Sequence, residues 1–306
     1  MSRIMFEDRV AVVTGAGGGL GETYALELAR RGCRVVVNDL GSARDGTGGG
    51  RTMADEVVDR IREEGGEATA NYDGVHTKEG GEGIIQAALN EYGKIDILIH
   101  NAGILRDRSF AKMEENEWRS VIEVHLNGAY YVTRPAFRVM KERKYGRILL
   151  TTSTSGLFGN FGQANYAAAK MGQIGLMHVL AIEGAKYGIK VNAISPGAMT
   201  RMTEDLDRTD LPEVSRDPEH ITAAAIYLVS ESCSQTNSII HASYGFFGRV
   251  QVAYNPGIFL GEEPASVEKF AEHWDDIAGV ENMKVQGETP YLLTVLKKAS
   301  EGDTAN

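Results

Sequence analysis

Cysteine is scarce in this chain, with Cys33 and Cys233 the only two among 306 residues. A disulfide scaffold or a cysteine-ligated metal centre needs more thiols at closer spacing, so we expect two reduced, partly buried side chains. The seven histidines are scattered and contain no H-x-x-x-H pair. The sequence therefore predicts no metal site.

Excess positive charge and long apolar runs are also absent. The formal net charge is -10 at pH 7, which argues against a nucleic-acid partner because contacts to phosphates need a cationic surface. No window approaches the roughly 20 apolar residues that span a bilayer. The N-terminal residues lack the apolar stretch and cleavage site of a signal peptide. We therefore expect a cytoplasmic protein that binds neither nucleic acid nor membrane.

Short β-branched runs alternate with segments of helical period from Val10 to about Ile194. This alternation predicts an α/β fold, a doubly wound parallel sheet with helices on both faces. The expected strands are Val10–Val13, Arg34–Asn38, Ala68–Tyr72, Ile95–His100, Gly146–Thr151 and Lys190–Ile194. The expected helices are Gly19–Arg31, Thr52–Glu64, Glu79–Tyr92, Glu114–Lys144 and Tyr166–Tyr187.

Two stretches break this alternation. The glycine-rich segment Gly41–Arg51 predicts a mobile loop after the second strand. After Pro196 we expect one helix at Ile221–Glu231, a last strand at Ser238–His241, and then about sixty residues of weak periodicity. We interpret residues 1–250 as one domain and residues 251–306 as a C-terminal extension packed on it, because so short a stretch holds little core of its own.

A glycine-rich turn, Thr14–Gly21, joins the first strand to the first helix. Glycines are needed there because the backbone must approach a pyrophosphate closely, and a helix N-terminus offers unpaired N–H groups. The spacing is T-G-x-x-x-G-x-G rather than G-x-G-x-x-G. The turn predicts a dinucleotide site that includes Gly15, Gly19, Leu20 and Gly21.

Asp39 follows the second strand, at the distance where a carboxylate accepts hydrogen bonds from the adenosine ribose. This carboxylate would repel a 2′-phosphate, so the sequence favours NAD as the cofactor. Arg44 and Arg51 in the next loop offer cations for such a phosphate, which leaves NADP as the alternative. A turn cap is the other interpretation of Asp39.

Two further segments follow expected strands at the edge where such sheets bind ligands. The first contains Asp73, Gly74 and Val75, which we expect near the adenine. The second is Asn101-Ala102-Gly103, whose small residues suit the close approach of a ring. A simple turn is the alternative for the second segment.

Tyr166 and Lys170 lie four residues apart in an expected helix, which places both side chains on one face. A free phenol has a pKa of about 10, and an adjacent ammonium favours the phenolate. We therefore expect Lys170 to lower the pKa of Tyr166 and make it a general acid/base. By chance alone, an exposed Tyr-x-x-x-Lys pair is common.

Other polar residues accompany this pair. Ser153 ends the fifth expected strand, thirteen residues before Tyr166, where its hydroxyl can hold a substrate oxygen. Asn127 lies within the expected long helix, where an amide often bends the backbone, and it can hold a water against Lys170. The neighbouring hydroxyl groups, which chemistry alone leaves open as alternatives to Ser153, belong to Thr152, Thr154 and Ser155.

Together these motifs stand in the order and spacing of the short-chain dehydrogenase/reductase family, which the chain resembles over about residues 7 to 245. The resemblance implies a Rossmann fold, hydride transfer with a nicotinamide cofactor, and an Asn-Ser-Tyr-Lys tetrad at Asn127, Ser153, Tyr166 and Lys170. It also implies that Lys170 holds the nicotinamide ribose. By the same resemblance, the cofactor contacts further on are Pro196, Gly197 and Thr200.

Within this family the chain is similar to the (3R)-hydroxyacyl-CoA dehydrogenase regions of multifunctional β-oxidation enzymes, notably over Gly159–Tyr166. From this sequence we expect no hydratase or sterol-carrier domain and no peroxisomal signal, since Asp303-Thr-Ala-Asn306 does not match one. The resemblance implies NAD-dependent oxidation of a (3R)-3-hydroxyacyl-CoA thioester in fatty acid metabolism. A steroid or other cyclic alcohol is the alternative substrate.

The aromatic-rich stretch around Leu157, Phe158 and Phe161 predicts either an apolar substrate pocket or plain core and subunit contact. A non-catalytic NAD-binding protein is the rival class, since a fold alone never proves activity. The apolar faces of the long helices predict association, and family resemblance implies a homodimer or homotetramer.

Overall fold

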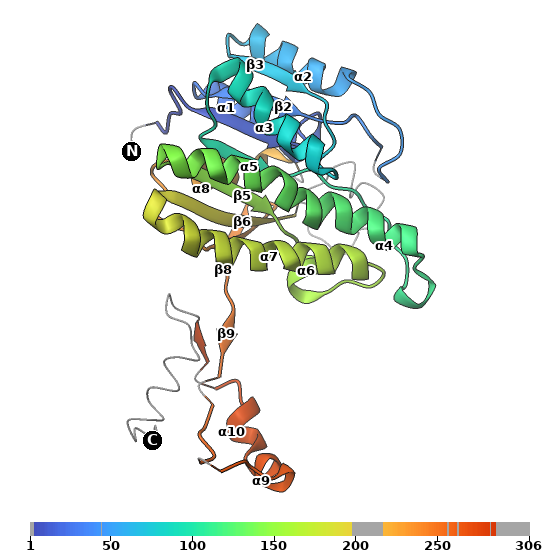
Figure 1. Ribbon diagram of the computed structural model, residues 1–306, viewed down its shortest axis with the longest axis vertical. Coiled ribbons are helices and arrows are strands. Elements are labelled where there is room, and N and C mark those ends of the chain that lie inside the picture. Colours follow the sequence, from blue (N-terminus) through green and yellow to red (C-terminus); the bar gives the residue numbers. More distant parts are fainter. Residues whose placement is uncertain are drawn as a thin grey trace. The chain divides into compact units, whose positions relative to one another are not determined.

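The computed structural model describes residues 3–43, 45–197, 217–255, 257–261, 263–281 and 283–285. Its main sheet has eight strands in the order β3-β2-β1-β4-β5-β6-β7-β8 (Figure 1). The pairings from β3 through to β7 are parallel. These strands are β1 (Val10–Thr14), β2 (Arg34–Asn38), β3 (Ala68–Asn71), β4 (Ile97–His100), β5 (Gly146–Thr151), β6 (Ile189–Gly197) and β7 (Ile239–Ser243).

Helices cover both faces of this sheet, as the sequence predicts (Figure 1). One layer holds α1 (Gly19–Arg30), α2 (Thr52–Glu63) and α8 (Glu219–Leu228). The other layer holds α3 (Lys78–Tyr92), α5 (Gly128–Arg143) and α7 (Ala164–Gly184). The doubly wound α/β prediction is therefore confirmed.

The strands read as apolar runs in the sequence because both faces of the sheet are buried. All five residues of β1 are buried, and so are all four residues of β4. Since neither face meets water, no alternation of polar and apolar residues is needed. This explains why the six expected strands could be found from their β-branched content.

The chain reverses direction across the sheet between β1 and β4. Strands β2 and β3 lie on one side of β1, whereas β4 to β7 lie on the other. Thr14 at the end of β1 pairs in register with His100 at the end of β4. The segments that follow these two strands therefore flank a crevice at the switch point, where sheets of this kind bind ligands.

The expected long helix Glu114–Lys144 is three elements instead of one. It begins as α4 (Glu115–Ile122), widens into a π-helical turn η2 (Glu123–Asn127), and continues as α5. In the wide turn the N–H of Gly128 donates to the carbonyl of Glu123. Pro135 lies inside α5 without ending it. Turns of this kind occur mostly at functional sites.

Several elements were not expected from the sequence. The short helix α6 (Thr154–Phe158) follows β5, and two 3₁₀ turns lie at η1 (Phe110–Lys112) and η3 (Ala185–Tyr187). Strand β8 (Phe246–Val250) follows β7 after the two-residue turn Tyr244-Gly245. Both turn residues have positive φ, 50° and 82°, as a tight hairpin requires.

The chain divides into two compact units, Met1–Arg249 and Val250–Asn306. Within the second unit, β9 (Ala253–Tyr254) pairs with β10 (Lys284–Val285) in antiparallel fashion. Its helices are α9 (Val267–Glu272) and α10 (Trp274–Ala278). That the extension packs on the first domain stays a prediction.

The described residues offer neither a membrane-spanning helix nor a cluster of metal ligands. None of the helices among them has the length and apolar character needed to cross a bilayer. Nor do the described histidine, cysteine and acidic side chains form a group of three or more that could hold a metal ion. Cys33 and Cys233 are buried and not joined to one another.

Candidate active site

The glycine-rich turn after β1 is shaped by backbone contacts that leave no room for side chains. A Cβ on Gly15 would lie 2.7 Å from the Cα of Ala102, and one on Gly21 would lie 2.1 Å from the carbonyl oxygen of Gly15. Gly15 and Gly19 also have positive φ, 64° and 56°. The first turn of α1 has no side-chain cap, so its N–H groups are available to an anion.

Asp39 lies at the end of β2 and is held by the backbone on both sides. Its Oδ2 accepts a hydrogen bond from the N–H of Gly17 at 2.8 Å, and its Oδ1 accepts one from the N–H of Gly41 at 2.7 Å. The carboxylate is therefore a turn cap as well as a wall of the cavity described below. Each oxygen retains a lone pair for a ligand hydroxyl.

The segments after β3 and β4 are tied to the strands beside them. The amide of Asn38 donates to Asn71 Oδ1 at 2.8 Å and to the carbonyl of Asp73 at 2.9 Å. The backbone N–H groups of Asn101 and Ala102 both donate to Thr14 Oγ1 at 3.1 Å. These bonds fix the two segments at the ends of β1 and β2, so the second segment is more than a simple turn.

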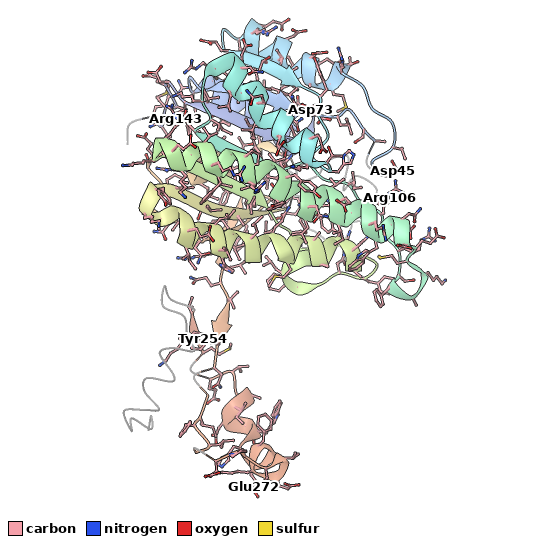
Figure 2. All side chains as sticks on the ribbon, in the orientation of Figure 1. Asp45, Asp73, Arg106, Arg143, Tyr254 and Glu272 are labelled. Carbon is pink, nitrogen blue, oxygen red and sulfur yellow. The ribbon has the colours of Figure 1, made fainter. Side chains whose placement is uncertain are left out.

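A cavity of about 1410 Å³ opens at this edge of the sheet. Figure 2 labels three residues on its wall, Asp45, Asp73 and Arg106, which come from three different loops. The wall contains most of the residues that the sequence predicts for the cofactor, namely Gly15, Gly19, Leu20, Asp39, Asp73, Gly74, Val75, Asn101, Ala102, Gly103, Tyr166, Lys170, Pro196 and Gly197. Gly21 is packed beneath the turn, and Thr200 lies outside the described residues.

Tyr166, Lys170 and Ser153 meet on the same wall. Ser153 caps α6 by accepting from the N–H of Ser155 at 3.2 Å. Its hydroxyl is also near enough to Tyr166 to lower the pKa of that phenol. Of the alternative hydroxyls, that of Thr152 donates to the carbonyl of Lys170, and Thr152 is not among the residues that line the cavity. Thr154 and Ser155 line the cavity together with Ser153, and of these hydroxyls only that of Ser153 affects the pKa of Tyr166 among the described residues. The choice of Ser153 stays a prediction.

The pKa of Tyr166 moves opposite to the expected direction. Burial raises the pKa of Tyr166 to about 12, the Ser153 hydroxyl opposes the rise, and the charge of Asp107 adds to it. Burial also lowers the pKa of Lys170 to about 7. Lys170 Nζ donates to the carbonyl of Thr151 at 2.5 Å and lies 5.5 Å from the centre of the Tyr166 ring. The lysine is therefore directed to the backbone, not to the phenol.

The π-helical turn places His125 against Tyr166, a contact that the sequence does not predict. His125 is buried, and its ring meets that of Tyr166 edge to face, with centroids 5.0 Å apart and planes at 89°. Its Nε2 lies 2.8 Å from the carbonyl oxygen of Ile104, and a Cβ on Gly103 would come within 2.3 Å of its Cε1. Burial holds the pKa of His125 well below its ordinary value, so the ring stays neutral.

Asn127 ends the same π-helical turn but is not among the residues that line the cavity. None of the side-chain hydrogen bonds found within the described residues links it to Lys170. The buried amide of Gln173 instead donates to the carbonyl of His125 at 2.7 Å. The break expected at Asn127 is present, whereas its contact with Lys170 stays a prediction.

Phe158 and Phe161 are 75% and 90% exposed, so the plain-core interpretation is wrong for both. Phe161 lines the cavity. Asn160, Gln163 and Tyr166 lie on the same wall. The loop between α6 and α7 is therefore part of the site.

Comparison with known proteins assigns the family. The family model described as short chain dehydrogenase matches residues 9–211. A short-chain type dehydrogenase/reductase of Mycobacterium tuberculosis is 50% identical over 92% of this chain and 98% of its own length. The peroxisomal hydratase-dehydrogenase-epimerase of Saccharomyces cerevisiae is 50% identical over 95% of this chain but only 32% of its own length. The chain belongs to the short-chain dehydrogenase family and is an oxidoreductase.

A solved structure agrees over nearly the whole chain. The full-length peroxisomal multifunctional enzyme type 2 from Drosophila melanogaster superposes with a TM-score of 0.81 and 36% identity, covering 98% of this chain and 51% of that one. The mouse enzyme of the same name is 43% identical over all of this chain and 42% of its own length. The chain thus spans a third to a half of these multifunctional relatives.

Proposed function

We propose that this protein oxidises a secondary alcohol to a ketone, reversibly and with NAD, and that its substrate is a (3R)-3-hydroxyacyl-CoA thioester. The observation that carries the proposal is that Ser153, Tyr166 and Lys170 line one cavity at the switch point of the sheet. The same cavity holds the glycine turn and Asp39. Proton transfer and dinucleotide binding therefore share one site.

The residues present fit a dinucleotide. The contacts around Gly15 and Gly21 exclude side chains, the first turn of α1 is uncapped, and Asp39 is fixed with lone pairs to spare. Bound NAD would supply the nicotinamide carbon that accepts the hydride from the alcohol. The glycine turn would hold its pyrophosphate and Asp39 its adenosine ribose.

The chain's own residues supply the proton chemistry. Ser153 would hold the substrate oxygen beside the Tyr166 hydroxyl, since both line the cavity. In its phenolate form Tyr166 would accept the hydroxyl proton as the carbinol carbon loses a hydride, and as a phenol it would return that proton in the reverse direction. Lys170 lies one helical turn from Tyr166, with its Nζ 5.5 Å from the centre of the ring, and would offer the nicotinamide ribose a donor. Asn127 is the fourth residue of the proposed catalytic tetrad, beside Ser153, Tyr166 and Lys170.

The preference for NAD over NADP rests on charge. A 2′-phosphate beside Asp39 would meet a carboxylate that is already fixed by two backbone donors. The guanidinium of Arg51 lies over the ring of Tyr72, 5.0 Å from its centre, and is engaged there. Arg44 lies outside the described residues.

The substrate class is tested with the purified wild-type protein and NAD. Absorbance at 340 nm is followed with a series of (3R)-hydroxyacyl-CoA thioesters, their (3S) isomers and a panel of hydroxysteroids. Turnover confined to (3R) thioesters supports the proposal. Turnover of steroids alone keeps the chemistry but overturns the substrate, and NAD binding without any turnover favours the non-catalytic alternative.

We also propose that the protein is a homodimer or homotetramer. Tyr130 on α5 and Val179 and Ile182 on α7 are 48%, 51% and 71% exposed, an unusual number of large apolar side chains on two neighbouring helices. Light scattering after size-exclusion chromatography tests this, and a monomer at micromolar concentration would contradict it. The cytoplasmic location stays a prediction.

A further inference from the structure

Helix α7 begins beside Tyr166 with an unusual arrangement of hydrogen bonds. Gln163 at its N-cap makes no side-chain cap bond. The side chain of Asn165 takes over, since its Oδ1 accepts from the N–H of Tyr166 at 2.8 Å. One of the free N–H groups at the start of the helix is thereby satisfied by the residue directly before the tyrosine.

The same amide also reaches two other parts of the wall. Asn165 Nδ2 donates to the carbonyl of Arg106 at 3.0 Å and to the carbonyl of Glu117 at 2.9 Å. Arg106 follows β4 and lines the cavity, whereas Glu117 lies in α4. Both amide hydrogens and the amide oxygen are therefore engaged, in a residue that is 0% exposed.

Two neighbouring bonds reinforce this junction from its outer side. The N–H of Arg108 donates to the carbonyl of Gly162 at 2.8 Å, and Gln163 Nε2 donates to Asp107 Oδ2 at 2.8 Å. Asp107 and Arg108 are exposed, so water can replace these partners. Water cannot reach Asn165, which makes its three bonds the ones that are costly to lose.

We propose that Asn165 is a positioning residue for the proposed dehydrogenase reaction, because it fixes the Tyr166 backbone relative to the cavity wall after β4. The Tyr166 ring packs edge to face against His125, and its backbone N–H is held by Asn165, so the position of its hydroxyl depends on both contacts. A displacement of about 1 Å at a reacting group can slow a reaction by two orders of magnitude. The inference rests on the proposed function, since it concerns the same tyrosine.

The matched control is Asn192 on β6, which is also 0% exposed and is bonded to two backbone groups, against three for Asn165. Its Nδ2 donates to the carbonyl of Gln235 at 3.1 Å, and its Oδ1 accepts from the N–H of Ser238 at 3.1 Å. Asn192→Ala therefore removes a buried amide of the same kind without touching α7. It separates a general loss of stability from a displacement of Tyr166.

The experiment compares Asn165→Ala, Asn165→Asp and Asn165→Ser with Asn192→Ala below their melting temperatures. We expect the Asn165 variants to lose at least tenfold in kcat with KM for NAD changed less than twofold, and Asn192→Ala to keep kcat within twofold. Asn165→Ser retains one acceptor and serves if the alanine variant does not fold. Asn165→Asp places a carboxylate beside Tyr166 and should shift the pH profile upward.

A second readout needs no activity at all. The 13Cζ resonance of Tyr166, assigned by its absence in Tyr166→Phe, should move or broaden in the Asn165 variants and stay in place in Asn192→Ala. An unmoved resonance, or an unchanged kcat, in a folded Asn165→Ala protein overturns the inference. A wild-type protein without turnover of any alcohol overturns the proposed function instead, while the resonance still decides the role of Asn165.

Discussion

Replacing the buried Lys170 by methionine should abolish activity and at the same time stabilise the unliganded protein. The side chain is 2% exposed, and burial lowers its pKa from the ordinary 10.5 to about 7. At about 1.4 kcal/mol per unit, burying the charged form costs about 5 kcal/mol. Losing the hydrogen bond from Lys170 to the carbonyl of Thr151 destabilises the folded protein by about 1 to 2 kcal/mol, which partly offsets this gain. We therefore expect Lys170→Met to raise the free energy of unfolding by about 3 to 4 kcal/mol at pH 7.

The increase in the free energy of unfolding caused by Lys170→Met should depend on pH, and proton linkage gives the direction. Between pH 7 and 10.5 the unfolded lysine keeps a proton that the folded lysine has released. Wild-type stability therefore rises with pH across this window, and the advantage of Lys170→Met should fall towards zero near pH 10.

Urea titrations at pH 7 and at about pH 10 measure both values, with the exposed Lys112→Met as a control that should change little at either pH. A Lys170→Met protein that is less stable at pH 7, or whose advantage does not change with pH, would refute the argument from burial.

Three further predictions concern the cavity. Gly21→Ala should abolish NAD binding in calorimetry, because its Cβ would lie 2.1 Å from the carbonyl oxygen of Gly15; binding as in the wild type would contradict the proposed pyrophosphate site. Asp39→Ser should raise the ratio of NADP to NAD affinity at least tenfold by removing the carboxylate, and an unchanged ratio would mean that another residue selects the cofactor. Gly103→Ala should lower kcat at least tenfold, since the new methyl group must displace the His125 ring from Tyr166; an unchanged kcat would show that this contact does not matter.

The parts of the fold that follow from local pattern were predictable. Most of the six expected strands are largely buried on both faces, so they are apolar, β-branched runs such as Val10–Thr14. Their observed ends lie within three residues of those expected, and the largest difference is at β6. Strand β3 is the exception in burial, since three of its four residues are only partly buried. The glycine turn and Asp39 were predictable for a similar reason, because backbone crowding leaves few residue types possible at Gly15 and Gly21.

The parts that depend on tertiary contacts were not predictable. The helical spacing of apolar residues over residues 114–144 continues through η2, so the sequence predicts one helix. A π-helical turn adds one residue to a turn without requiring particular residue types, so it leaves no sequence signal. His125 contacts Tyr166 only because that turn rotates it inward, and Asn165 is engaged by carbonyls from Arg106 and Glu117 that are distant in sequence. A lone histidine and a lone asparagine carry no sequence signal for such roles.

The expectation that Lys170 lowers the pKa of Tyr166 was wrong for a related reason. The four-residue spacing places the two side chains on one helix face, but the lysine finds the nearer carbonyl of Thr151. Burial then destabilises the charged forms of both residues, which raises the pKa of Tyr166 and lowers that of Lys170. Spacing alone could not reveal either effect.

The most direct test of the central claim is the formation of NADH at 340 nm by the wild type and by Tyr166→Phe, with a (3R)-hydroxyacyl-CoA thioester and saturating NAD. The account predicts turnover by the wild type and a loss of at least a thousandfold in Tyr166→Phe, with the dissociation constant for NAD changed less than a few fold. A Tyr166→Phe protein that retains a tenth or more of the wild-type rate would contradict the assignment of Tyr166 as the acid/base.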